Sequence, residues 1–188
     1  MNASLRSTTN RRVWAAGRVV DPWPSVGPVG SGEAHVGVVA RNMLFRLPAT
    51  LPDAPGARLI RTDPALAQLG HTAFSAEEAG QEVRTLRWPL AHTERAAAAR
   101  REDGLVKLVA DAKGRLLGAG VLGPAAEEIA AVLSLAVSRR LPLSALAGLD
   151  LPGPAFAEAV RQAAASFYGP KITGDGARRL VKMAKWLP

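Results

Sequence analysis

The sequence predicts an α+β fold in which helices cover an antiparallel sheet. The first observation is that residues 105–110 and 115–122 have the character of two strands on either side of a short turn, as in a β-hairpin. The second is the apolar stretch that follows Pro124, whose length and composition favour a buried helix. The third is that strands and helices do not alternate regularly, as a parallel βαβ sheet would require.

The elements before the hairpin are predicted from local signals. We expect strands at 12–16, 58–62 and 83–90, and helices from about 34 to 47, from 75 to 78 and between 90 and 101. In the first helix, Val38, Val39, Leu44 and Phe45 predict a buried stripe, and Pro48 ends the helix. Ser75 is the expected cap of the second.

The turn of the hairpin is Asp111 to Gly114, because Gly114 is free to adopt a positive φ. After it, Pro124 suits a first helical turn and two glutamates suit the positive end of the helix. We expect this helix to be heavily buried, through the side chains of Ile129, Val132, Leu133, Leu135, Ala136 and Val137. We expect a linker at 52–56 and further helices at 144–147, 154–168 and 176–187.

The composition excludes several classes of site and partner. The chain has 188 residues and no cysteine, which removes disulfides, thiolate metal sites and a redox dithiol. The formal net charge is +8, but the basic residues are scattered and only 5% of residues are aromatic, so we expect no nucleic-acid partner. No apolar run reaches the length of a transmembrane helix, and no secretory signal is evident, so we expect a cytoplasmic protein.

Several segments together resemble one family. These are Arg12–Gly17, His35–Phe45, Thr62–Gly70, the hairpin and Gly123–Pro124. Their order resembles the carboxyl-terminal part of the pyridine nucleotide-disulfide oxidoreductases, which include mercuric reductase, dihydrolipoamide dehydrogenase and glutathione reductase. The resemblance runs from about residue 8 to residue 168. It implies a remnant of an FAD-binding domain at 1–50, a dimerisation domain at 51–168 and a basic carboxyl-terminal helix at 169–188.

The resemblance also implies where a flavin would lie. In the family, a strand ends in a Gly-Asp pair whose aspartate binds the ribityl chain of FAD, and a helix then points its positive end at the flavin. Gly17 matches the glycine, but Arg18 replaces the aspartate and supplies only hydrogen-bond donors. The vestigial cofactor-binding residues are therefore Gly17, Ala34 and His35, and we expect this chain alone to bind no FAD. The alternative is that Gly17 is a turn residue and His35 a surface or interface histidine.

The catalytic histidine of the family is missing. The family carries a His-Pro pair followed by a glutamate, and the histidine serves the redox thiol of the partner subunit. Here Pro152 and Glu158 match, but Leu151 stands in the place of the histidine and cannot transfer a proton. His71 and His92 lie in turn or helix-entry segments with no nearby nucleophile, and we expect them to be structural or solvated. We therefore assign no catalytic residue and no metal ligand.

Three functions remain open. In the first, the chain is a degenerate dimerisation module. In the second, it is one subunit of a split FAD/NAD(P)H-dependent oxidoreductase whose other chain binds FAD and NAD. In the third, it is a basic module that binds nucleic acid or a membrane surface. We expect a homodimer, because the helix after Pro124 and the leucines at 143, 146 and 149 offer more apolar surface than one sheet covers. The apolar residues of the amino-terminal remnant, which include Val13, Trp14, Val38 and Phe45, need cover from the dimerisation domain or from a partner.

Overall fold

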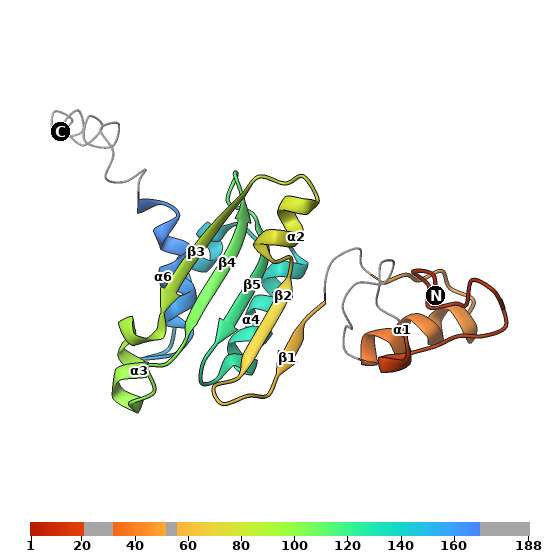
Figure 1. Ribbon diagram of the computed structural model, residues 1–188, viewed down its shortest axis with the longest axis horizontal. Coiled ribbons are helices and arrows are strands. Elements are labelled where there is room, and N and C mark those ends of the chain that lie inside the picture. Colours follow the sequence, from red (N-terminus) through yellow and green to blue (C-terminus); the bar gives the residue numbers. More distant parts are fainter. Residues whose placement is uncertain (21–31, 52–55, 170–188) are drawn as a thin grey trace.

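The computed structural model describes residues 1–20, 32–51 and 56–169 (Figure 1). The described chain contains a five-stranded antiparallel sheet with helices, which confirms the predicted α+β class. An amino-terminal region with its own small helix lies to one side of the sheet, next to β1 in Figure 1.

The sheet has the strand order β1-β2-β5-β4-β3, and every pairing is antiparallel. Its strands are β1 (Arg58–Ile60), β2 (Leu66–Gly70), β3 (Val83–Pro89), β4 (Leu105–Asp111) and β5 (Leu116–Leu122). β2 was not among the strands expected from the sequence, because its five residues carry neither a clear alternation nor flanking aromatic residues. The expected strands at 58–62 and 83–90 are present but end earlier, at Ile60 and Pro89.

The β4-β5 hairpin forms as predicted. Gly114 has φ +81°, and its N–H donates to the carbonyl oxygen of Asp111 (2.9 Å). The Asp111 carboxylate accepts hydrogen bonds from the N–H groups of Lys113 (2.9 Å) and Arg115 (2.8 Å). The turn is therefore fixed by one glycine and one aspartate.

Two helices cover one face of the sheet, and both contribute to the main core. α4 (Ala126–Ser138) packs on β2 and β5, and α6 (Glu158–Ser166) packs on β3 and β4. The short α5 (Leu143–Ala147) packs on α6. The sheet contributes buried residues such as Leu69, Val106, Leu108, Ala119 and Val121 to this core.

The other face is covered at one end by α2 (Ala73–Glu78), whose Ala76 packs with Val109 and Leu117. The N-cap of the helix is Thr72, not Ser75. The Thr72 hydroxyl accepts from the N–H of Ser75 (3.0 Å), and the Ser75 hydroxyl accepts from the N–H of Thr72 (3.0 Å). This reciprocal capping box places the serine three positions inside the cap, which corrects the expected cap. After β3 follow η2 (Leu90–His92) and α3 (Glu94–Ala99).

The amino-terminal region comprises η1 (Gly17–Val19) and α1 (Gly32–Met43). Leu5 and Val20 are buried at its centre, and Val38, Val39 and Leu51 pack against them. The region thus supplies part of its own cover, which the sequence analysis did not anticipate.

Several predicted elements of this region and of the helices after β5 differ from the structure. No strand forms at 12–16, where Trp14 makes only an isolated bridge with Arg6, because the described residues provide no neighbouring strand. α1 ends at Met43, five residues before Pro48, and Arg46 beyond it has φ +53°. The predicted buried stripe of this helix is correct for two of its four residues. Val38 and Val39 pack inwards, whereas Leu44 and Phe45 are exposed.

The helix expected after Pro124 begins later. Ala125, with φ +57°, is the cap of α4, so Pro124 lies outside its first turn, while Glu127 and Glu128 occupy that turn as predicted. The helix expected at 154–168 spans only Glu158–Ser166, and α5 begins one residue earlier than expected. The predicted helix at 176–187 and most of the predicted linker at 52–56 lie outside the described residues.

Candidate functional site

The predicted cofactor-binding residues lie near the amino-terminal end of α1. The Gly17 N–H donates a hydrogen bond to Nδ1 of His35 (3.1 Å), and His35 is only 2% exposed. The alternative of a surface or interface histidine is therefore wrong, and Gly17 begins a 3₁₀ turn with φ +77°. Ala34, the third predicted residue, is exposed beside His35. The polar atoms of Gly17 and His35 are thus directed at one another.

The segment that matches the catalytic pair has a different organisation. Leu151 is half-buried in the connection between α5 and α6, and Glu158 is the first residue of α6. One carboxylate oxygen of Glu158 accepts from the Glu94 N–H at the start of α3 (3.4 Å), and the other lies 3.6 Å from the Arg161 guanidinium. Glu158 therefore joins α6 to α3. Its partner Glu94 is 64 positions away in the chain, so no local pattern signals the contact.

The remaining histidines contact their own neighbours. Nδ1 of His71 lies 3.5 Å from the Ser75 hydroxyl, so a potential nucleophile is closer than expected. That hydroxyl already accepts from the Thr72 N–H and serves the capping box, which leaves it poorly placed to attack a substrate. The ring of His92 meets the edge of Trp88 with 6.0 Å between centroids.

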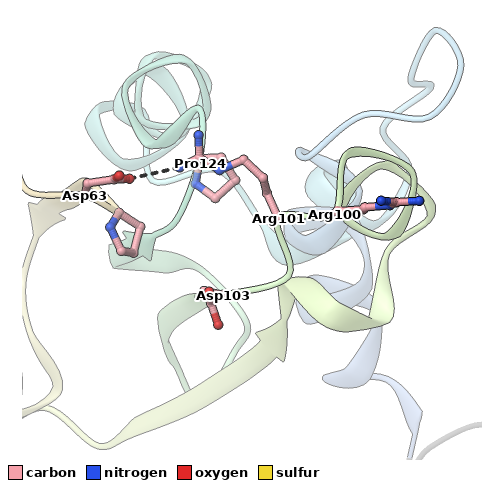
Figure 2. A pocket seen from close by; sticks show the side chains of 6 residues that line it. Asp63, Arg100, Arg101, Asp103 and Pro124 are labelled. Atoms are coloured by element: carbon pink, nitrogen blue, oxygen red, sulfur yellow. Dashed lines mark hydrogen bonds and ion pairs between the residues drawn. The ribbon is translucent and has the colours of Figure 1, made fainter.

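A polar cavity of about 310 Å³ lies between the β1-β2 connection, the end of α3 and the start of α4. Its lining includes Asp63, Arg100, Arg101 and Asp103. Figure 2 shows the Asp63 carboxylate directed at Arg101, 2.9 Å away, while Arg100 and Asp103 point away from this pair. Both members of the pair are largely exposed, so water screens their attraction. The formal charges of these four side chains sum to zero.

Two sides of α4 are apolar. Ala126, Ile129, Leu133 and Ala136 point into the core of the sheet. The opposite side carries Ala131, Val132 and Leu135, and Leu135 is 62% exposed. The expectation of a heavily buried helix therefore holds for Ile129, Leu133 and Ala136, whereas Val132 and Leu135 are exposed within a single chain.

A shallow apolar groove continues from the exposed side of α4 to the edge of the sheet. It is lined by Ala57, Leu59, Ala130 and Ala131, with Glu127 and Ser134 among its polar lining. The leucines of α5 do not extend this surface, because Leu143 and Leu146 are 0% and 2% exposed and Leu149 packs against the same core. The prediction that they add to an intersubunit surface is wrong, since α6 covers them within the chain.

The described residues also limit other kinds of site. In the ranges 1–20, 32–51 and 56–169, no three histidine, aspartate or glutamate side chains gather closely enough to hold a metal ion. Within the same ranges, no helix combines the length and apolar character needed to span a bilayer.

Comparison with known proteins identifies a family and several relatives of this chain. Residues 57–164 match the family described as pyridine nucleotide-disulphide oxidoreductase, dimerisation domain. A dihydrolipoyl dehydrogenase of Haloferax volcanii is 33% identical over 168 residues, which cover 89% of this chain and 35% of that protein. A mercuric reductase of Streptomyces lividans is 35% identical over 161 residues, covering 85% of this chain and 33% of the enzyme. The chain thus spans about a third of the length of these relatives.

Solved structures share the fold. LpdA of Mycobacterium tuberculosis superposes with a TM-score of 0.74 at 22% identity, over 88% of this chain and 36% of that one. The HOCl-induced flavoprotein disulfide reductase RclA of Escherichia coli, in its Cu(II) complex, gives 0.70 at 21% identity, over 88% and 37%. In both comparisons the matched part of this chain is longer than residues 57–164.

Proposed function

The chain belongs to the pyridine nucleotide-disulphide oxidoreductase family, and from this premise we propose that it is a dimerisation module that pairs two copies and has no reductase activity of its own. The family resemblance seen in the sequence is thereby confirmed for residues 57–164. The division of the chain into three parts, with boundaries after residues 50 and 168, is also a proposal.

The observation that carries the pairing is the exposed apolar side of α4. Ala131, Val132 and Leu135 are accessible on a helix whose other side already fills the core. A helix that is apolar on two sides is stable in water when both sides are covered. A second copy would cover this side through the same residues, as in a twofold interface.

The absence of reductase activity is proposed on chemical grounds. The chain has no cysteine to form a redox dithiol, and Leu151 cannot act as an acid or base. Glu158, which matches the glutamate of the family pattern, is engaged with the Glu94 N–H and Arg161. No part of the reductase chemistry is therefore assigned to this chain alone.

We propose that Gly17, Ala34 and His35 are a remnant of the family's FAD site and that this chain alone binds no FAD. The Gly17 N–H and Nδ1 of His35 are bonded to one another, so these two atoms are not available as direct ligands of a flavin in this arrangement. The sequence also places Arg18 where the family has a ribityl-binding aspartate.

The pairing is tested by light scattering of the unaltered chain and of Leu135→Glu. We expect a dimer mass for the unaltered chain and a monomer mass for the variant, because an unpaired buried carboxylate opposes association. Phe74→Glu is the matched control, since Phe74 is equally exposed but lies on α2, on the opposite face of the sheet. A monomer mass for the unaltered chain at micromolar concentration would contradict the proposal.

A second function is favoured by a different observation. The apolar residues of α1 that do not face the small amino-terminal core are uncovered, among them Val36, Met43 and Leu44. This supports a role as one subunit of a split oxidoreductase, in which a separate chain carries the flavin- and nucleotide-binding parts. The two functions are compatible, because α4 and α1 present different surfaces.

A further inference from the structure

We propose that a row of basic and polar residues across the face of the sheet opposite α4 and α6 binds a linear phosphate polyanion. The row consists of Arg58, Gln68, Gly120, Lys107 and Arg87, one residue from each strand, and we call it the basic row. The inference is independent of the functions proposed above, because the row lies on neither α4 nor α1.

The pairing of the strands places these five residues in one line. In the order just given, each residue pairs with the next across neighbouring strands. Residues that pair in this way share a face of the sheet, and neighbouring strands are about 4.8 Å apart, so the row spans roughly 19 Å. Its three cations come from positions 58, 87 and 107, which explains why the basic residues look scattered in the sequence.

The basic row is accessible along its length. The alternate residues of the same strands form the main core beneath α4 and α6, and α2 covers the opposite face only at one end (Figure 1). The atoms nearest to a side chain placed at Gly120 would be Oε1 of Gln68 (3.3 Å), the Ala67 carbonyl oxygen (3.9 Å) and Cβ of Lys107 (4.0 Å). All three belong to the neighbouring strands, so the centre of the row borders on the sheet and not on another element.

The cations of the basic row have no acidic partner among the described residues. The two ion pairs in the ranges 1–20, 32–51 and 56–169 join Arg101 with Asp63 and Arg161 with Glu158. The only acidic residue of the five strands is Asp111, and its carboxylate accepts from two N–H groups of the hairpin turn. The described part of the chain therefore leaves the positive charge of the row uncompensated.

Two of the cations lie directly opposite one another. Arg87 on β3 pairs with Lys107 on β4, and we call these two residues the anchor pair. Like charges in this arrangement repel, and the repulsion destabilises the sheet. An anion held between the two head groups would replace the repulsion by charge-assisted hydrogen bonds from the guanidinium and the ammonium group. The anchor pair is therefore the strongest part of the proposed site.

The chemistry of the basic row favours a phosphate chain over a polypeptide or a nucleic acid. Its arginines and lysine supply only hydrogen-bond donors, whereas phosphate oxygens are acceptors. An acidic polypeptide would also bring backbone N–H groups, for which the side chains of the row offer a single acceptor, Oε1 of Gln68. The row contains no aromatic side chain on which a base would stack.

The position of α2 favours a narrow, soluble ligand over a membrane surface. The chain that enters α2 passes over β5 beside the basic row, because a side chain at Gly118 would overlap the carbonyl oxygen of His71. A helix is about 10 Å across, so α2 would hold a flat bilayer away from the row. A flexible chain of phosphates can lie along the row beside the helix.

The test measures the binding of orthophosphate and of long-chain inorganic polyphosphate to the full chain by isothermal titration calorimetry at low salt. The variants are Arg87→Gln, Arg87→Lys and Lys107→Gln in the anchor pair, and Arg58→Gln at the far end of the row. Lys113→Gln is the matched control, since Lys113 is exposed in the hairpin turn and its loss changes the net charge equally while the row stays intact.

Polyphosphate should bind about tenfold or more tightly than orthophosphate, because it reaches more of the row. Arg87→Gln and Lys107→Gln should each weaken its binding about fivefold or more, and Lys113→Gln less than about twofold. Arg87→Lys keeps the charge and should retain most of the affinity. Arg58→Gln should weaken the binding of polyphosphate but not of orthophosphate, because a single phosphate at the anchor pair does not reach the far end.

Three results would overturn the inference. The first is that polyphosphate does not bind, and the second is that Lys113→Gln weakens binding as much as the anchor variants do, since the attraction would then depend on net charge alone. The third is that polyglutamate, a single-stranded oligonucleotide or phosphatidylglycerol vesicles bind more tightly than polyphosphate and lose this binding in Lys107→Gln, because the ligand of the row would then belong to another class.

Discussion

The carboxylate of Glu158 accepts a hydrogen bond from the backbone N–H of Glu94, and this contact ties the first residue of α6 to the first residue of α3. The amino-terminal end of a helix favours a carboxylate, because its N–H groups lack partners within the helix. Thr93, which precedes α3, makes no side-chain cap of its own, so Glu158 supplies the missing acceptor.

Replacing Glu158 with alanine should therefore lower the free energy of unfolding by about 1 kcal/mol, the usual scale of a helix-capping interaction, and replacing it with glutamine should cost less. The amide retains an oxygen for the Glu94 N–H but loses the charge that attracts Arg161. Glu158→Ala should cost more than Glu158→Gln in urea denaturation. Equal stability of all three proteins would show that the contact contributes nothing.

A second prediction concerns the end of the β2-β5 pairing. A side chain at Gly118 would overlap the backbone carbonyl oxygen of His71, whose N–H donates to the Leu117 carbonyl oxygen (3.0 Å). Gly118→Ala should destabilise the fold by roughly 1–3 kcal/mol, because the obstacle is backbone and not a flexible side chain. Thermal unfolding measures this. Gly37→Ala, where a side chain meets open space, is the control and should stabilise α1 by roughly 0.5–1 kcal/mol.

A third prediction concerns the buried histidine of the amino-terminal region. His35→Ala should leave the Gly17 N–H without its acceptor and create a cavity beside α1. We expect amide hydrogen exchange to accelerate at Gly17 and along α1, while β4 and β5 keep their protection, since the two cores are separate. His35→Asn, which keeps a side-chain acceptor, should restore part of the protection. Exchange that accelerates equally throughout the sheet would mean that the two cores unfold together.

The hairpin and α4 could be predicted because their signals are local. Gly114 and Asp111 fix the turn within five residues, and the apolar stripe of α4 repeats at helical spacing. The contacts that were missed join distant positions, such as Gly17 with His35 and Glu94 with Glu158. In each of these two contacts the bonded partner belongs to another element of the structure. No spacing within a local stretch of sequence therefore predicts the contact.

The same limit explains the error about the intersubunit surface. Leu143 and Leu146 are apolar in the sequence whether α6 or a second copy covers them, and only the α5-α6 packing decides between the two. The exposed side of α4 carries aliphatic residues such as Val132 and Leu135, as the buried side does. The apolar content of α4 and α5 therefore predicts that some of their surface is covered. It does not predict which part is covered within the chain and which part remains for a partner.

The final prediction is that the purified chain does not couple NAD(P)H oxidation to reduction of a disulfide or of mercuric ion, and that Leu151→His does not create this activity. The variant would restore the histidine that precedes Pro152 in the family pattern, but the chain still has no cysteine to receive or donate the proton and electrons. Glu158, which matches the glutamate of the family pattern, is moreover engaged with the Glu94 N–H and Arg161. The decay of NAD(P)H absorbance should match buffer for both proteins, with an intact family member as the positive control. Turnover by the unaltered chain that persists after flavoprotein contaminants are removed would contradict the proposal of an inactive module, and turnover by Leu151→His alone would show that the histidine was its only missing part.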